Sequence, residues 1–126
     1  MLTRRGWIIG AGSLGVSALL PAARGMDWPQ FRGADRSNVS REIGLFRKWP
    51  AAGPKRLWSV PVEQGYAGAA IVGGRVYHHD YDVKKSEWIA NCRSLADGKQ
   101  IWQFREAREI RANHAITRTV PAVAGR

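Results

Sequence analysis

Short apolar runs alternate with turn residues through the middle of the chain. Residues 68–72 are apolar, and Gly73-Gly74 follows as a two-residue turn of the kind that needs positive φ. Residues 75–82 then supply aromatic and β-branched side chains. This pattern predicts a short strand, a tight turn and a second, antiparallel strand.

The same pattern continues for two more segments. A polar loop at residues 82–86 leads into residues 87–95, which we expect to form a third strand carrying Trp88, Ile89 and Cys92. Asp97-Gly98 is the strongest short hairpin signal in the chain, and residues 100–104 follow it. We therefore expect four consecutive antiparallel strands and an all-β fold.

A sequence repeat indicates the kind of fold to which such a four-stranded unit belongs. Residues 70–75 are echoed by residues 122–126, with the glycine and arginine 51 positions further on (125 − 74). Trp58 and Trp102 close similar phrases 44 positions apart (102 − 58), near the roughly 40 to 45 residues of a propeller blade. The prediction is a β-propeller with one blade at about residues 66–105 and the next beginning at about residue 119; a β-sandwich would not explain this spacing.

Closure of a propeller also needs more chain than is present. Four blades of about 40 residues need roughly 160 residues, and the whole chain has 126. We therefore expect an N-terminal fragment of a longer repeat protein, with residues 55–126 forming a partial propeller.

The first 25 residues have the layout of an export signal. A short basic stretch with Arg4 and Arg5 precedes an uncharged run, and small residues lie at Ala23 and Gly25. The arginine pair resembles a twin-arginine signal, and an ordinary secretory signal is the alternative. We expect a mature chain from Met26, with cleavage after Ala23 as the alternative, that is periplasmic or secreted and does not span the membrane after signal removal.

Two segments lie between the signal and the repeat. Residues 26–54 contain several prolines and aromatic residues without a clean period, and we interpret them as an extended lead-in that lays aromatic rings on the body of the protein. Residues 55–62 have the composition of a strand, which Pro61 would place at an edge.

The net charge and its distribution limit the classes of partner that we expect for the chain. The chain carries a net charge of +10, and loss of the signal with Arg4, Arg5 and Arg24 leaves +7 (17 − 10). No block of five like charges occurs, so no nucleic-acid partner is expected. The connection after the fourth strand is rich in arginine, with Arg105, Arg108, Arg111 and Arg118. Because glutamates lie between these arginines, we expect a solvated link between blades. The alternative is a short helix with the arginines along one side, which would form an anion-binding stripe.

Few residues suggest chemistry. His78 and His79 are adjacent on an expected strand and so point to opposite faces, which prevents them from sharing one metal ion. His78 and Asp80 share a face, but two ligands are too few for a tight site. His114 beside Asn113 is interpreted as part of the connection into the next blade. The sequence therefore predicts no catalytic residue and no metal site, and it leaves cofactor binding unknown.

The segment from Cys92 to Trp102 resembles the tryptophan-docking motif of the pyrroloquinoline-quinone-type (PQQ-like) repeat, A-x-D-x-x-T-G-x-x-x-W. Gly98 and Trp102 match this motif, whereas Cys92, Ser94 and Asp97 replace its alanine, aspartate and threonine. In that family the tryptophan packs between blades and the turn residues bond around it. The resemblance implies that six residues dock neighbouring blades: Trp58, Cys92, Ser94, Asp97, Gly98 and Trp102. Gly73 and Gly74 are expected to be turn glycines.

The resemblance also frames function. Quinoprotein enzymes of this kind hold PQQ near a calcium ion, and their alcohol dehydrogenases add a disulfide between adjacent cysteines. This chain has one cysteine, Cys92, and no Asp/Asn cluster at ligand spacing. We therefore expect a non-catalytic binding or scaffold protein with other envelope proteins as partners, similar in architecture to the propellers that assist outer-membrane β-barrel assembly. A quinoprotein oxidoreductase remains the alternative, with PQQ and calcium supplied by downstream repeats, and an anion-binding module is the second alternative.

Overall fold

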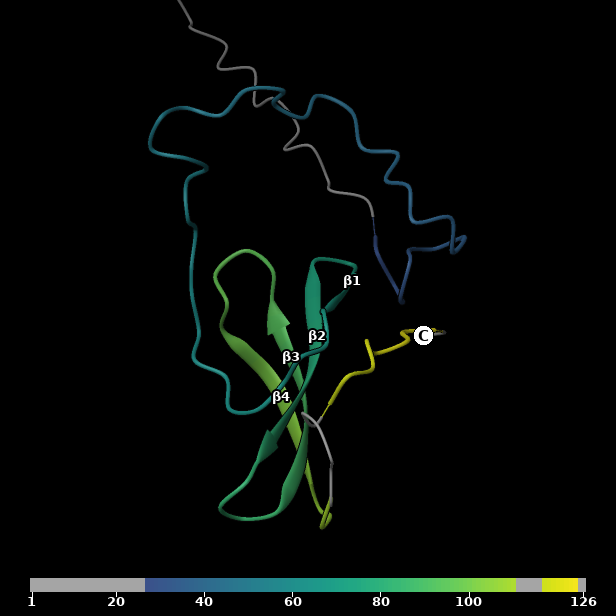
Figure 1. Cartoon of the computed structure of the whole chain (residues 1–126), viewed down its shortest axis with the longest axis vertical. Coiled ribbons are helices and arrows are strands. Elements are labelled where there is room, and N and C mark those ends of the chain that lie inside the picture. Colours follow the sequence, from purple (N-terminus) through teal and green to yellow (C-terminus); the bar gives the residue numbers. More distant parts are fainter. Residues whose placement is uncertain (1–26, 111–116, 125–126) are drawn as a thin grey trace, which may run out of the picture.

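Alternating apolar residues and glycine turns build one antiparallel sheet in the chain (Figure 1). The computed structural model describes residues 27–110 and 117–124. Its strands are β1 (Ala70–Val72), β2 (Arg75–Asp82), β3 (Glu87–Ser94) and β4 (Gln100–Ala107). They lie in the order β1-β2-β3-β4, and each pairs antiparallel with the next. The all-β prediction is confirmed, and within the described residues no helix is present.

Local turn chemistry fixes the three hairpins. Gly73 and Gly74 adopt φ values of 57° and 73°, which is the left-handed region that their two-residue turn needs. In the next loop the Asp82 side chain accepts hydrogen bonds from the backbone amides of Lys84 and Lys85, both at 3.1 Å. These contacts end β2 and start the reversal into β3.

The strand register sorts the side chains onto two faces. Tyr77, Cys92 and Trp102 lie opposite one another across β2, β3 and β4, so they share one face. Asp80 and Ile89 pair on the other face. A β-bulge lies where the pairing passes from Cys92 to Arg93. The buried apolar residues come from both faces and are Ala70, Val76, Tyr81, Ile89 and Cys92.

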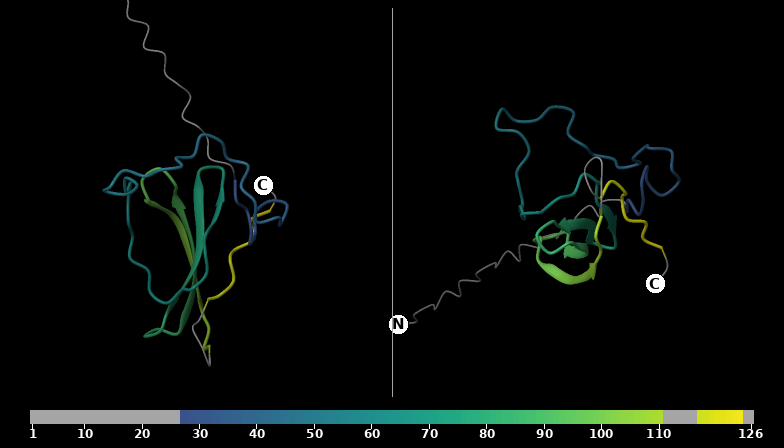
Figure 2. Two further views of the ribbon diagram at one scale, coloured as in Figure 1. Left: turned by 45° about the horizontal axis from the view of Figure 1, so that its top comes forward. Right: turned by 60° about the horizontal axis from the view of Figure 1, so that its bottom comes forward.

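Irregular segments cover the sheet and its β1 edge. The backbone amide of Gln64 donates to the carbonyl of Tyr81 at 3.3 Å, and that of Glu63 donates to the Asp80 carboxylate at 3.0 Å. On the β1 edge, Trp28 and Ile71 form an isolated antiparallel bridge. Figure 2 shows residues 35–57 arching away from the sheet as a long loop without strands.

Two expectations for the residues before the sheet are wrong. Residues 55–62 form no strand: Pro61 lacks an amide hydrogen, and the hydrogen bond from the segment to the β3–β4 loop comes from the Trp58 side chain. Most aromatic rings of the lead-in are not laid on the sheet either. Phe46 and Trp49 pack on each other, with ring centroids 5.8 Å apart, and both are exposed, as is Phe31.

The repeat unit itself is close to its expected limits. β4 continues to Ala107, three residues beyond the predicted end at Phe104, whereas residues 122–124 form no strand. The sheet is open, since β4 has no strand partner on its outer side among the residues that are described. The export signal, Arg111, Asn113 and His114 lie outside the described residues. In the described part of the chain, no helix has the length and apolar character needed to cross a bilayer.

Candidate functional site

The loop between β3 and β4 receives the side chain of Trp58. The indole Nε1 of Trp58 donates a hydrogen bond of 2.8 Å to the backbone carbonyl of Leu95. The ring lies directly over Gly98, where an added Cβ would come within 2.8 Å of the ring atoms Cδ2 and Cε3. Gly98 also has a φ of 72°, so both the backbone conformation and the close approach favour glycine at this position.

Hydrogen bonds within the loop hold this docking surface. The backbone amide of Gly98 donates to the Ser94 carbonyl at 2.9 Å, and the amide of Lys99 donates to the Asp97 carboxylate at 3.2 Å. A hydrogen bond from the Ser94 side chain lowers the pKa of the exposed Asp97 carboxyl below its usual value. The loop is therefore held by hydrogen bonds of its own in addition to its contact with the Trp58 ring.

The six residues expected to dock blades fall into two groups. Trp58, Ser94, Asp97 and Gly98 meet at the β3–β4 loop. Cys92 is fully buried within the sheet, directly opposite Trp102 on the neighbouring strand. The Trp102 ring packs 6.2 Å from that of Tyr77 and does not join the loop contacts. Docking of Trp102 against a neighbouring blade stays a prediction.

Aromatic side chains gather on the face that carries Trp102. The His79 and Trp88 rings lie 5.0 Å apart, and the Trp88 and Phe104 rings lie 6.3 Å apart. Trp102 is 43% exposed and Phe104 is 54% exposed, so β4 leaves much apolar area open to solvent. We call this surface the aromatic face, and its residues are Tyr77, His79, Trp88, Trp102 and Phe104.

The two strand histidines point to opposite faces, as the alternation predicts. His78 Nε2 lies 3.4 Å from the Nε of Arg93, which donates to it, and the carboxylate of Asp80 is engaged by the amides of Glu63 and Tyr81. These contacts are structural. Within the described residues, no group of three or more His, Cys, Asp or Glu side chains is arranged to hold a metal ion.

Burial of the histidines makes stability depend on pH. Desolvation lowers the pKa of both His78 and His79 below the ordinary value of 6.5. A depressed folded-state pKa means that the stabilising contribution is present above pH 6.5 and is lost as the pH falls below it. We expect the urea midpoint to drop between pH 7.5 and pH 5, and the drop to be smaller in His79→Gln. An equal drop in the variant would show that His79 contributes nothing to it.

The arginine-rich connection is not a helix over its described part. Arg105 lies on β4 and pairs with Glu87 at 2.9 Å and with Asp82 at 3.8 Å. Arg108 pairs with Glu106 at 3.2 Å, and its guanidinium carbon lies 6.0 Å from the centre of the Trp88 ring. Over residues 105–110 the alternative of a helical stripe is therefore not supported, because the strand extends through Ala107 and Arg105 and Arg108 pair with carboxylates.

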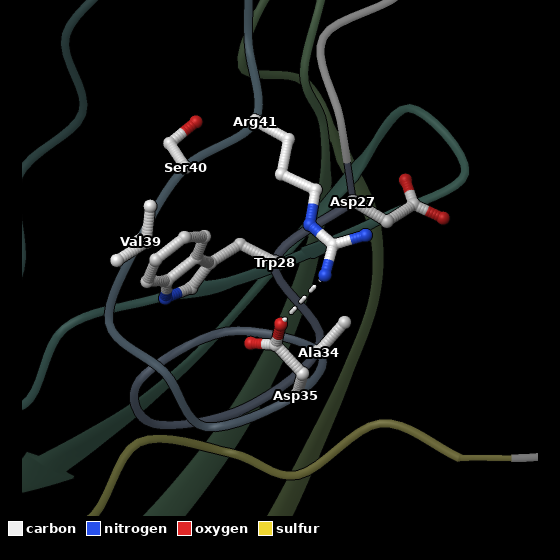
Figure 3. Close-up of a pocket in the computed structure, with 7 residues that line it drawn as sticks. All are labelled: Asp27, Trp28, Ala34, Asp35, Val39, Ser40 and Arg41. Atoms are coloured by element: carbon white, nitrogen blue, oxygen red, sulfur yellow. Dashed lines mark hydrogen bonds and ion pairs between the residues drawn. The ribbon is translucent and has the colours of Figure 1, made fainter.

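A small pocket lies where the lead-in loop meets the Trp28 ring (Figure 3). Its volume is about 240 Å³. One face of the Trp28 ring packs on Gly33, and the Arg41 guanidinium reaches across to the Asp35 carboxylate at 3.1 Å. The carboxylate of Asp27 accepts a hydrogen bond of 2.9 Å from the amide of Gly73. The residues that line the pocket are Asp27, Trp28, Ala34, Asp35, Val39, Ser40 and Arg41.

The sequence pattern does not predict this pocket. A signal is nevertheless present, since Asp35, Ser37 and Ser40 each accept a hydrogen bond from a backbone amide two residues later, as residues in Asx and ST turns do. That signal indicates a folded loop, but the wall made by Trp28 depends on a bridge to Ile71 that is distant in sequence.

Comparison of the chain with protein-family models, with curated proteins and with solved structures finds no match.

Proposed function

We propose that this chain belongs to an exported, PQQ-type β-propeller protein whose role is binding and scaffolding in the cell envelope. The observation that carries the proposal is the seating of Trp58 on Gly98. A tryptophan from the segment before the sheet hydrogen-bonds the β3–β4 loop across 37 residues of sequence. In a propeller, such a contact joins the segment of one blade to the turn of the next.

The aromatic face supports the same architecture. Residues 121–124, which contain most of the repeated phrase, lie beside Tyr77, Ala90 and Trp102 on this face. The amide of Val123 also donates to the carbonyl of Pro29 at 2.8 Å. A sheet that begins here would cover the exposed rings of Trp102 and Phe104, as neighbouring blades cover one another.

The chemistry of the described polar residues supports scaffolding over catalysis. Asp80 holds the segment before β1, Asp82 ends a strand, and Asp97 shapes the docking loop. Each carboxylate thus has a structural partner. A surface built from packed strands and exposed aromatic rings suits protein binding, in which aromatic side chains supply much of the energy.

Photo-crosslinking tests the propeller. A photoreactive amino acid at position 102 in the complete protein should give a crosslink to a peptide of the same chain outside residues 27–124, since a second sheet is expected to cover that position, whereas crosslinks to residues 121–124 are expected with or without that sheet. The matched control is position 43, where Ile43 is 93% exposed and far from any strand in sequence. We expect no such crosslink from the control, and absence of an intrachain product outside residues 27–124 from position 102 would contradict the proposal.

Cofactor loading separates scaffold from enzyme. The complete protein, purified from the envelope fraction, is assayed for dye-linked alcohol oxidation with and without added PQQ and calcium. The scaffold proposal expects no dye reduction and no change in melting temperature. Saturable activity that needs both additions would replace it with the quinoprotein oxidoreductase.

A further inference from the structure

A second cleft lies between the lead-in loop and the C-terminal described segment. Its volume is about 410 Å³. The arginine loop, which we define as residues 30–38, forms one wall, and Val120 and Ala122 form the other. Arg32 and Arg36 are the only charged residues in its lining, which is completed by Gln30 and Phe31.

Backbone hydrogen bonds fix both walls. Trp28 and Ile71 exchange two hydrogen bonds, at 2.7 and 2.9 Å, which tie the residues just before the arginine loop to β1. The amide of Val123 donates to the Pro29 carbonyl at 2.8 Å and so ties the opposite wall to the same residues. In Figure 1 these two segments lie side by side at the β1 edge of the sheet. The cleft is therefore preorganised, which lowers the entropy cost of binding.

The two arginines of the arginine loop have an unfavourable backbone conformation. Arg32 and Arg36 have φ values of 67° and 59°, in the left-handed region that residues other than glycine seldom adopt. The loop is closed internally by the amide of Asn38, which donates to the Arg32 carbonyl at 3.0 Å. Residues in such conformations cluster at functional sites, where surrounding contacts maintain them.

Hydrogen bonds also direct Arg36. Its Nη2 donates to the Gln30 Oε1 at 3.4 Å, and the Gln30 Nε2 donates to the Ala34 carbonyl at 3.2 Å. The Gln30 side chain is thus held at both ends. This arrangement keeps the Arg36 guanidinium beside the cleft and leaves its other N–H groups available to a ligand.

The nearby carboxylates are committed elsewhere. Asp35 pairs with Arg41 at 3.1 Å and accepts the amide of Ser37 at 3.0 Å. Asp27 accepts the amide of Gly73. Across residues 27–110 and 117–124, no carboxylate lies within 4.0 Å of the Arg32 or Arg36 guanidinium. Two positive charges thus line one cleft without a described counterion.

We propose that the cleft between the arginine loop and residues 120–122 binds a tetrahedral oxyanion, namely a phosphate or sulfate group. Guanidinium groups present paired N–H donors that match the oxygens of such a group, and two of them balance its double charge. The volume of about 410 Å³ exceeds that of the oxyanion alone, so the cleft also has room for a larger molecule that carries such a group. The same chemistry is offered by a soluble phosphate ester and by a lipid headgroup.

Calorimetric titration of the complete protein with inorganic phosphate and inorganic sulfate, at low ionic strength, tests the site. We expect saturable binding that Arg32→Gln/Arg36→Gln weakens at least about tenfold, because the charge-assisted hydrogen bonds are lost. Arg32→Lys keeps the charge but loses the paired donors, and it should fall between the two. The control is Arg47→Gln/Arg56→Gln, which removes the same charge from two exposed positions outside the cleft.

The control and the choice of probe decide the outcome. Absence of saturable binding to either anion overturns the proposal, as does an equal loss of affinity in the control. Far-UV circular dichroism of each variant verifies that the sheet persists. Vesicles of phosphatidylglycerol, compared with phosphatidylcholine, then identify the source: retention that depends on Arg32 and Arg36 assigns a lipid headgroup, and inorganic phosphate binding without retention assigns a soluble ester. The crosslink from position 102 reports the propeller independently of this result.

Discussion

Gly98→Ala is expected to destabilise the protein by about 3 kcal/mol. Two effects add at this position. An alanine at φ 72° costs backbone energy, and its Cβ would lie 2.8 Å from the Trp58 ring, which must then leave the loop. Displacing the ring also breaks the hydrogen bond from Trp58 to Leu95. Urea denaturation followed by circular dichroism measures the loss.

Gly74→Ala is the matched control. Gly74 has nearly the same φ, 73°, but no atom lies within 4 Å of the added Cβ. It should therefore show the backbone cost alone, about 1 kcal/mol. In a Trp58→Ala background, the cost of Gly98→Ala should fall toward this value, which a double-mutant cycle detects. Equal costs for Gly98→Ala and Gly74→Ala in the original background would mean that Trp58 is not seated on the loop.

Ile89→Ala is expected to cost about 3 kcal/mol as well, through a cavity. Ile89 lies on the inner strand β3, is 2% exposed, and pairs with Asp80 on β2 and Arg105 on β4. Few apolar side chains are buried in the sheet, so little neighbouring material is available to fill the space. Because small units are marginally stable, the variant should be largely unfolded at 37 °C, as thermal melts would show.

Ile43→Ala provides the comparison for the core variant. Ile43 is 93% exposed in the loop before the sheet, so its truncation removes the same atoms without opening a cavity. We expect a change within about 0.5 kcal/mol. Similar melting temperatures for the two variants would contradict the placement of Ile89 in the core.

The hairpins are predictable from the sequence because their causes are local. Gly73-Gly74 and Asp97-Gly98 specify turns by backbone conformation alone, and alternation marks the strands between them. The end of β4 is less predictable, since Arg105 and Glu106 interrupt the apolar pattern. Their charges are tolerated there because Arg105 pairs with Glu87 across the strands. That compensation depends on register, which composition does not reveal.

The segments around the sheet depend on distant contacts and are harder to predict. Trp58 binds through its indole and not through a ladder, so a strand-like composition at residues 55–62 is misleading. Likewise, the arginine loop and the Trp28 pocket are walled by contacts to Ile71 and Val123. No local pattern around residues 27–41 indicates those partners, because each partner is distant in sequence.

The reactivity of the Cys92 thiol reports whether the sheet is folded. It is the only cysteine of the chain, and it is fully buried on the inner strand β3. A buried thiol is inert, whereas an exposed one reacts with labelling reagents and with other thiols. In an oxidising compartment, each molecule whose sheet opens presents one unpaired thiol to its neighbours. Dimers linked by a disulfide between two Cys92 residues would then accumulate, even if each opening of the sheet is brief.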